Sequence, residues 1–217
     1  MTVRILGEVP ARQVLSLDEY VVVDVETTGM KADTQDIIEL GALLVRQGEV
    51  REAFSSLIRR EKSPYIPGFI IQLTGITESM LIREGRPLDE VMERFCLLAG
   101  KLPLVAHNAS FDYRFLQAAA AYCNEFREKQ GRDRLLLDNC VFDTLAMSRK
   151  LYKKVSHNLS ELARMLQIDS RGAHRALQDC YMAHGVLQKM MGHPDWNKWF
   201  GQRAGWLKKT VRRNTQI

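Results

Sequence analysis

The chain has 217 residues, of which 46% are hydrophobic and 26% charged, as expected for a globular domain with a sizeable core. No apolar run approaches the roughly 18 residues of a membrane-spanning helix, and the N-terminus lacks the pattern of a secretory signal. Residues 193–217 hold six basic side chains and one acid, so the net charge of +5 lies in them and the rest of the chain is neutral. The four cysteines form no C-x-x-C pair, so neither a zinc site nor a redox motif is indicated, and free thiols in a reducing cytoplasm are expected.

The N-terminal half of the chain is rich in strand patterns. Residues 1–18 form an extension of mixed character, and the β-branched stretch EYVVVDVE at 19–26 predicts the first strand. Two apolar runs within 37–58 are separated by Gln-Gly, which predicts a hairpin of two more strands. Residues 61–77 contain several prolines and glycines and indicate a loop with short helical pieces.

From residue 87 onward, helical and strand patterns alternate. Helices are predicted at 87–100, 110–130, 144–152, 156–168 and 172–191, and short strands at 102–108 and within 135–144. Asn158 and Glu161 stand at capping-box spacing before the fourth of these helices. Three leading strands followed by this alternation favour an α/β fold, a mixed sheet with helices on its faces. We expect one domain at 19–192 and a basic, tryptophan-containing tail at 193–217.

Two carboxylates interrupt the first predicted strand, VVVDVETTG at residues 21–29. Asp24 and Glu26 are two positions apart, so on a strand they point to the same face with Cα atoms roughly 7 Å apart. Two carboxylates on one face of a buried strand repel each other and lose hydration, and no lysine or arginine is near in the sequence to answer them. A divalent cation held by oxygen ligands would do so. The alternative is that Asp24 ends the strand and the following residues form a solvated turn.

Two further stretches carry polar residues near helix starts. Asp112, in HNASFDYRFL, falls in the first turn of a predicted helix after a strand, where an acid also serves as a cap. His174 and Asp179, in HRALQD, are five apart and do not share a helix face. His174 is therefore expected at the mouth of the last helix and Asp179 in its second turn, although a histidine there is also common as a surface or capping residue.

Taken together, these residues indicate chemistry that none of them indicates alone. Four acids and one histidine, each near a strand end or an early helical turn, are the inventory of a two-metal phosphoryl-transfer site. The metal ions would stabilise the charge that develops on phosphorus and on the leaving oxygen. A histidine with a pKa near neutrality would take a proton from the attacking water.

The three stretches VDVETTG, VAHNASFD and HRALQD, in this order across about residues 18–190, resemble the three motifs of the DEDD exonuclease superfamily in its histidine subtype. The nearest resemblance is to the epsilon subunit of bacterial DNA polymerase III and to the exonuclease domain of PolC-type polymerases. The resemblance implies a ribonuclease H-like sheet of about five strands. It also implies 3′→5′ hydrolysis to nucleoside 5′-monophosphates with two divalent cations, Mg²⁺ or Mn²⁺.

The resemblance also implies roles for single residues. The metal ligands would be Asp24, Glu26, Asp112 and Asp179, and His174 would be the general base. The 3′-terminal nucleotide would be held by Thr27, Thr28 and Gly29, with further substrate contacts from Leu73, Thr74, Ile76, Asn108 and His174. Leu73 and Ile76 are expected as stacking surfaces in a loop that resembles the family's wedge, and Thr74 stands where many epsilon subunits carry histidine. Asn108 would order the turn before its helix. Asp143 is expected to cap a helix or to support the metal ligands from behind, rather than to bind metal itself.

The tail combines aromatic and basic residues at near-helical spacing. Its members are Trp196, Trp199, Phe200, Arg203, Trp206 and Leu207. Such a segment could follow phosphates and stack bases, dock on a partner protein, or pack back on the domain with its cations solvated.

Three functions remain open from the sequence. The leading one is a metal-dependent 3′→5′ exonuclease on single-stranded DNA ends, in proofreading or repair, with a DNA polymerase subunit as a candidate partner and no membrane. The second is an exoribonuclease that trims RNA 3′ ends, because the same acids serve any phosphodiester. The third is a non-catalytic binding module of the same fold, which the presence of all five expected residues argues against.

Overall fold

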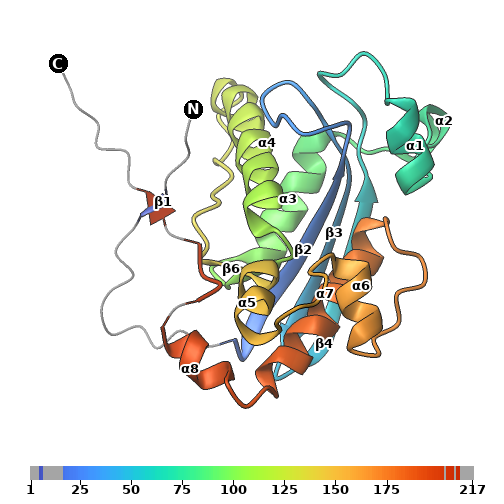
Figure 1. Cartoon of the computed structure of the whole chain (residues 1–217). Coiled ribbons are helices and arrows are strands. Elements are labelled where there is room, and N and C mark those ends of the chain that lie inside the picture. Colours follow the sequence, from blue (N-terminus) through green and yellow to red (C-terminus); the bar gives the residue numbers. More distant parts are fainter. Residues whose placement is uncertain (1–4, 7–16, 203, 208, 211–217) are drawn as a thin grey trace.

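The computed structural model describes residues 5–6, 17–202, 204–207 and 209–210. A five-stranded sheet of order β4-β3-β2-β5-β6 forms its centre (Figure 1). The strands are β2 (Glu19–Thr27), β3 (Ile37–Arg46), β4 (Glu49–Leu57), β5 (Leu104–Ala106) and β6 (Val141–Asp143). Strand β3 is antiparallel to β2 and β4, whereas β5 runs parallel to β2 and β6 parallel to β5. The predicted mixed α/β sheet of about five strands is confirmed.

The hairpin between β3 and β4 forms at the predicted dipeptide. Gln47 and Gly48 have positive φ values of 52° and 79°, as a two-residue type I′ turn requires at both central positions. Arg46 and Glu49 pair across the turn. This tight reversal fixes the register of the two strands, and with it the face on which every β3 side chain lies.

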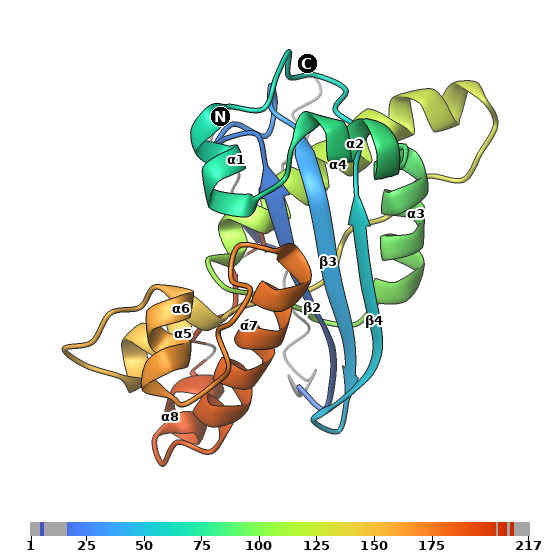
Figure 2. The same cartoon turned by 90° about the vertical axis from the view of Figure 1, so that its right-hand side faces the viewer.

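Helices cover both faces of the sheet (Figures 1 and 2). One face carries α3 (Leu88–Ala99) and α4 (Ala109–Lys129), and the other carries α5 (Thr144–Leu151), α6 (Leu159–Met165) and α7 (Ala176–Met191). Strand β2 alternates between them: Val21, Val23 and Val25 belong to the core with α3 and α4, whereas Tyr20 and Val22 belong to the core with α7. Even-numbered residues of β2 therefore face α7. No helix in the described part of the chain combines the length and apolarity needed to cross a bilayer.

Two short helices, α1 (Gly68–Thr74) and α2 (Glu78–Glu84), lie beyond the end of the sheet where β2 finishes (Figure 2). The prediction of a loop with helical pieces is confirmed for α1, while α2 was not predicted. Thr77 is the N-cap of α2, because its side chain accepts a hydrogen bond from the N–H of Met80. The prolines and glycines just before Thr77 favoured a loop in the sequence and hid this helix start.

The described part of the tail packs on the domain. Helix α8 (Trp196–Gly201) buries Trp196 against Phe142 of β6, and the chain then runs beside β6, where Leu207 N–H donates to Val141 O (2.9 Å) and Asp143 N–H to Gly205 O (2.7 Å). This is the intramolecular alternative considered for the tail. Strands β1 (Ile5–Leu6) and β7 (Lys209–Thr210) form a separate parallel pair. Arg203 of the expected aromatic-basic set lies outside the described residues, as do 208 and 211–217.

Candidate active site

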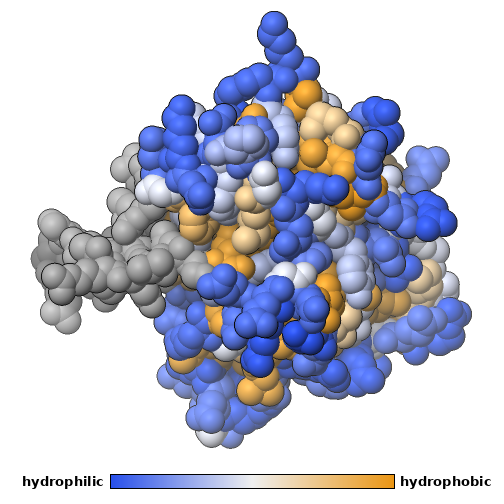
Figure 3. All heavy atoms as spheres, turned by 90° about the horizontal axis from the view of Figure 1, so that it is seen from below, coloured by the Kyte–Doolittle hydropathy of each residue, from blue (hydrophilic) through white to orange (hydrophobic). Residues whose placement is uncertain are grey.

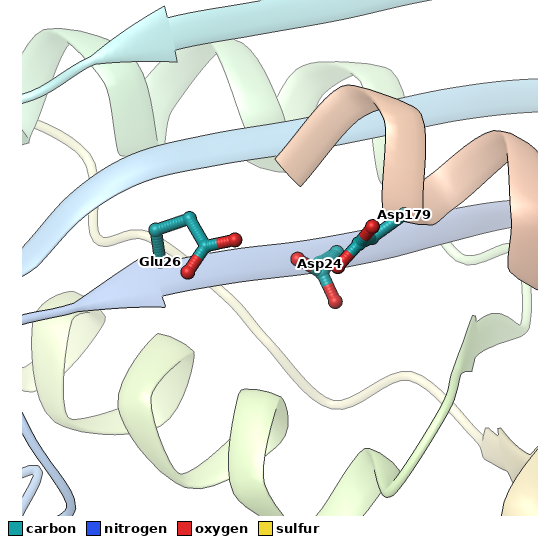
Figure 4. Close-up of side chains that lie close together, drawn as sticks. All are labelled: Asp24, Glu26 and Asp179. Atoms are coloured by element: carbon teal, nitrogen blue, oxygen red, sulfur yellow. The ribbon is translucent and has the colours of Figure 1, made fainter. Parts of the chain in front are cut away.

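Asp24 and Glu26 project from β2 toward the start of α7, where Asp179 meets them (Figure 4). One carboxylate oxygen of each residue lies within 4.8 Å of those of the other two. The register of β2 and β3 shifts by one residue between Glu26 and Thr27, a bulge of the kind that redirects side chains next to active sites. The same-face arrangement predicted for the two strand carboxylates is therefore present, and the strand does not end at Asp24.

Asp112 reaches the cluster from the first turn of α4. Strand β5 pairs with β2 only at Val21 and Val22, so the edge of β2 beyond them has no neighbouring strand there. The N–H of Val25 donates instead to Asp112 Oδ1 (3.2 Å), and the Asp112 side chain is buried. Because β5 is short, the backbone of Val25 has no partner strand among the described residues on this side, and the Asp112 carboxylate occupies that place. Asp112 is outside the 4.8 Å group of three oxygens but raises the pKa of Asp24 through its charge.

The entry to α7 has an unusual backbone. His174 adopts a left-handed conformation with φ of 67°, and its N–H donates to Asp179 Oδ1 (3.2 Å). A left-handed histidine is uncommon, and such outliers concentrate at functional sites. Helix α7 then lies directly on β3: a Cβ added at Gly41 would be 2.5 Å from the backbone of Ala176 and Leu177. As predicted, His174 precedes the helix, while Asp179 lies in its first rather than its second turn.

A fifth carboxylate, which the sequence analysis missed, lies behind the cluster. Glu39 of β3 pairs with Glu26 across the sheet and is 2% exposed. It accepts two hydrogen bonds from the Arg175 guanidinium (2.7 and 3.0 Å) and one from the N–H of Ala176 (3.0 Å). An acid in the buried run IIELGALL was the available signal for Glu39. Arg175 gave none, because only the fold brings it to Glu39.

The clustered acids raise one another's pKa. Burial is the largest cause for each of them. It is followed at Asp24 by the charges of Asp112 and Asp179, and at Glu26, whose pKa rises to about 7, by the charge of Asp179. Burial raises the pKa of Asp112 to about 8, although hydrogen bonds to its carboxylate act in the opposite direction. The folded chain thus holds these groups where their ionised forms are unfavourable without added positive charge.

These residues fit a divalent cation. The side-chain donors are carboxylate oxygens, the ligands that Mg²⁺ and Mn²⁺ prefer. Arg175 lowers the pKa of Glu26 but is bound to Glu39 and leaves the remaining repulsion unanswered. From the sequence, a metal was expected because two strand carboxylates lacked a cationic partner. In the structure Asp112 and Asp179 add two more negative charges, so the need for a metal is greater.

The turn after β2 is stabilised by its own hydroxyl groups. Thr27 Oγ1 donates to Gly29 O (2.7 Å), while Thr28 Oγ1 accepts from Asp36 N–H (3.0 Å) and lies 2.7 Å from Ser63 Oγ. Both threonines are buried, so their side chains serve the turn. Gly29 is buried as well, and its carbonyl is the acceptor for Thr27. The nucleotide-binding role expected for Thr27, Thr28 and Gly29 stays a prediction.

The predicted stacking residues divide into exposed and buried ones. Leu73 is 50% exposed, and Phe69, one turn earlier on α1 and missed by the sequence analysis, is 64% exposed. Ile76 is fully buried in a cluster with Ile38, so the expectation that it offers a stacking surface is wrong. Thr74 is also buried, and its hydroxyl donates to Ile70 O and accepts from the N–H of Ile76 at the end of α1. The Thr74 side chain is therefore engaged within the protein, and its expected contact with substrate stays a prediction.

Asn108 and Asp143 organise the junction between β5, β6 and their helices. Asn108 has a left-handed backbone (φ 69°), and its N–H donates to Asp143 Oδ1 (3.1 Å). Asp143 also accepts from the N–H groups of Leu145 and Ala146 at the start of α5. The capping role expected for Asp143 is confirmed. The side chain of Asn108 is exposed and free to meet a substrate, which stays a prediction.

The comparisons with known proteins agree with this geometry. Residues 21–187 match the model of the RNase_T exonuclease family. The DNA polymerase III PolC-type of Caldanaerobacter subterraneus subsp. tengcongensis is 35% identical over 176 residues, which cover 80% of this chain and 12% of that protein. The chain thus spans about an eighth of the length of this relative.

Solved exonucleases share the fold. Exonuclease X in complex with 5′ overhanging duplex DNA superposes with a TM-score of 0.62 at 23% identity, covering 82% of this chain and 93% of the other. E. coli Exonuclease I in complex with a dT13 oligonucleotide gives 0.67 at 16% identity, covering 86% and 43%. With the ribonuclease H-like sheet and the clustered carboxylates, the chain belongs to the RNase_T exonuclease family, within the DEDDh-type 3′→5′ exonuclease superfamily.

Proposed function

We propose that this nuclease is a metal-dependent 3′→5′ exonuclease that hydrolyses single-stranded DNA ends to nucleoside 5′-monophosphates. The observation that carries the proposal is the convergence of Asp24, Glu26 and Asp179 oxygens within 4.8 Å, beside Asp112 and at the mouth of α7, where His174 stands. Two divalent cations, Mg²⁺ or Mn²⁺, would be held by these four carboxylates and would supply charge stabilisation and water activation.

The chain's own residues divide the remaining work. His174 takes the proton of the attacking water on a ring nitrogen, while its backbone N–H stays bound to Asp179 and holds the residue in its left-handed conformation. Asp112 is held against the edge of β2 by Val25. Leu73 and Phe69 offer exposed apolar surface to the terminal bases. The turn of Thr27, Thr28 and Gly29, which directly follows Glu26, would lie beside the terminal nucleotide.

DNA is the proposed substrate because the PolC-type relative is named as a DNA polymerase and the two solved structures described above, among many that match, are bound to DNA. For the same reason we propose a DNA polymerase subunit as the partner and proofreading or repair as the process. The proposed compartment is the cytoplasm. The RNA-trimming alternative uses the same carboxylates and differs in contacts to the 2′ position.

The test uses 5′-labelled single-stranded DNA and RNA of one sequence, with Mg²⁺, Mn²⁺ or a chelator. The expected result is a ladder that shortens from the 3′ end of DNA, requires metal, and is lost in Asp24→Asn. A ladder on RNA alone would replace the substrate and keep the site. Binding of DNA without hydrolysis under every metal condition would overturn the proposal in favour of a non-catalytic module.

A further inference from the structure

A patch of unpaired cations lies on the side of the molecule where α5 and α8 meet. Between Asp143 and Glu161 the chain holds four basic residues and no acid. We name as the basic platform these four and two residues of α8: Arg149, Lys150, Lys153, Lys154, Lys198 and Trp199. The five cations are exposed, and none takes part in any ion pair found among the described residues.

Helix stability explains only part of this charge. Arg149 and Lys150 stand in the last turn of α5, where cations favour the helix dipole. Lys153 and Lys154 follow the helix, and Lys198 belongs to another one, so the dipole of α5 does not account for them. A concentration of like charge without ion-paired acids opposes folding unless something negative binds there.

Trp199 brings two of the ammonium groups together. Lys150 Nζ lies 5.1 Å and Lys198 Nζ 5.2 Å from the centre of its half-buried ring. Cation–π attraction offsets part of the repulsion between the two lysines. The indole thus contacts one cation from α5 and one from α8 and links the two helices within the patch.

The basic platform is joined to the candidate active site by α5. This helix starts at Asp143, which binds the N–H of Asn108 just before α4 and Asp112. Its eight residues cover about 12 Å. His107, which precedes Asn108, is hydrogen-bonded to Thr144 Oγ1 at the start of α5 (2.9 Å) and to the carbonyl of His157, three residues after Lys154 (2.8 Å).

We propose that the basic platform binds the phosphodiester backbone of the single strand, at nucleotides upstream of the 3′ end held by the carboxylates. This inference rests on the proposed exonuclease function and extends it. A nucleic acid is favoured over a protein partner because the platform holds no exposed large apolar side chain, whereas the centre of a protein interface is depleted of charge. The surface seen from below, the end that carries α8, is mostly hydrophilic with separate apolar patches (Figure 3).

The first experiment measures binding with a chelator present, so that the result does not depend on hydrolysis. Fluorescence anisotropy with labelled dT20 is recorded for the wild type and for a variant that combines Lys150→Gln, Lys153→Gln, Lys154→Gln and Lys198→Gln. We expect about 10- to 100-fold weaker binding in the variant. The slope of log affinity against log salt should shrink by about 3, because each contact on a single strand contributes roughly 0.7.

A charge-matched control removes four cations elsewhere that already have acidic partners: Arg83→Gln, Arg86→Gln, Lys101→Gln and Arg134→Gln. It should bind dT20 within about 3-fold of the wild type, since each of these cations is already neutralised by its acidic partner. Equal weakening in both variants would reduce the effect to net charge and overturn the proposal. Unchanged binding in the platform variant would also overturn it and leave an acidic protein surface as the partner to test.

Hydrolysis then separates this inference from the proposed function. In the platform variant, KM for dT20 should rise about 10-fold or more while kcat/KM for a dinucleotide stays within 2-fold of the wild type. Loss on both substrates would mean damage to the active site and would contradict the platform's role. If the wild type hydrolyses neither substrate, the proposed function fails, and the anisotropy result still decides whether the platform binds the strand.

Discussion

Replacing Arg175 with methionine tests how the carboxylate behind the cluster is stabilised. The substitution keeps much of the side-chain volume and leaves Glu39, 2% exposed, with the N–H of Ala176 and a 3.4 Å contact from the Ser55 hydroxyl. Removing one partner of a buried ion pair costs about 3–5 kcal/mol. Because the Arg175 side chain is 43% exposed, water screens the pair, and we expect a loss of about 2–3 kcal/mol in the free energy of unfolding.

The reciprocal substitution, Glu39→Gln, should be milder. The Arg175 guanidinium left behind is exposed enough to be hydrated, and the amide oxygen of the introduced glutamine can still accept the hydrogen bond from the N–H of Ala176. The substitution also removes one negative charge close to Glu26 and Asp24. We expect a loss of about 1 kcal/mol or less. In the double variant the buried charge is gone, so its loss should be smaller than that of Arg175→Met alone.

Thermal and urea unfolding in the presence of a chelator measure these differences. At about 2–4 °C per kcal/mol for a chain of this size, Arg175→Met should lower Tm by about 4–12 °C. Arg171→Met, which breaks the exposed pair with Asp169, is the matched control and should change stability by less than about 1 kcal/mol. A loss for Glu39→Gln equal to that for Arg175→Met, or a double variant that loses the sum of both, would mean that Arg175 does not stabilise the buried Glu39 charge.

Three further predictions concern the site itself. Without metal, the protein should lose stability as pH rises from about 4 to about 8. The reason is that folding raises the pKa of Glu26 to about 7 and that of Asp112 to about 8. The protonated carboxyl groups, which the folded state favours, are present at low pH and are lost over this range. Thermal unfolding at pH 5 and pH 8.5 checks this, and a saturating divalent cation should reduce or reverse the difference; greater stability of the metal-free protein at pH 8.5 would contradict it. Gly41→Ala should displace the start of α7, since its Cβ would be 2.5 Å from backbone, and should weaken Mn²⁺ binding in calorimetry, whereas unchanged binding would mean that α7 adjusts freely. His174→Ala should lower kcat by about 100-fold or more while Mn²⁺ affinity is kept, and a change below 10-fold would remove His174 as the base.

Local features of the fold followed from the sequence. The hairpin at Gln47 and Gly48 and the caps at Asn158 and Asp143 depend on residues within a few positions of one another. The shared face of Asp24 and Glu26 followed from the two-residue period of a strand. Each of these interactions is decided within a single element or turn, so the order of residues was enough to predict it.

Other features depend on how distant elements meet. The ion pair between Glu39 and Arg175 forms because α7 packs directly on β3 at Gly41. The register of β2 with β3 then places Glu39 beside Glu26. Asp112 binds Val25 only because β5 is short. Ile76 was assigned to a surface because its motif forms a loop, whereas α1 and α2 close over it and bury it. Sequence periodicity contains none of these long-range contacts.

Anomalous diffraction from crystals grown with Mn²⁺ and a nucleoside 5′-monophosphate would locate the metal ions and the reaction product in the protein. We expect Mn²⁺ peaks among the carboxylates of Asp24, Glu26, Asp112 and Asp179, with the phosphate beside them and the His174 ring facing it. The same crystals of Asp24→Asn should lose a peak. Strong Mn²⁺ peaks elsewhere with none between β2 and α7 would contradict the assignment of this cluster as the metal site and, with it, the proposed reaction.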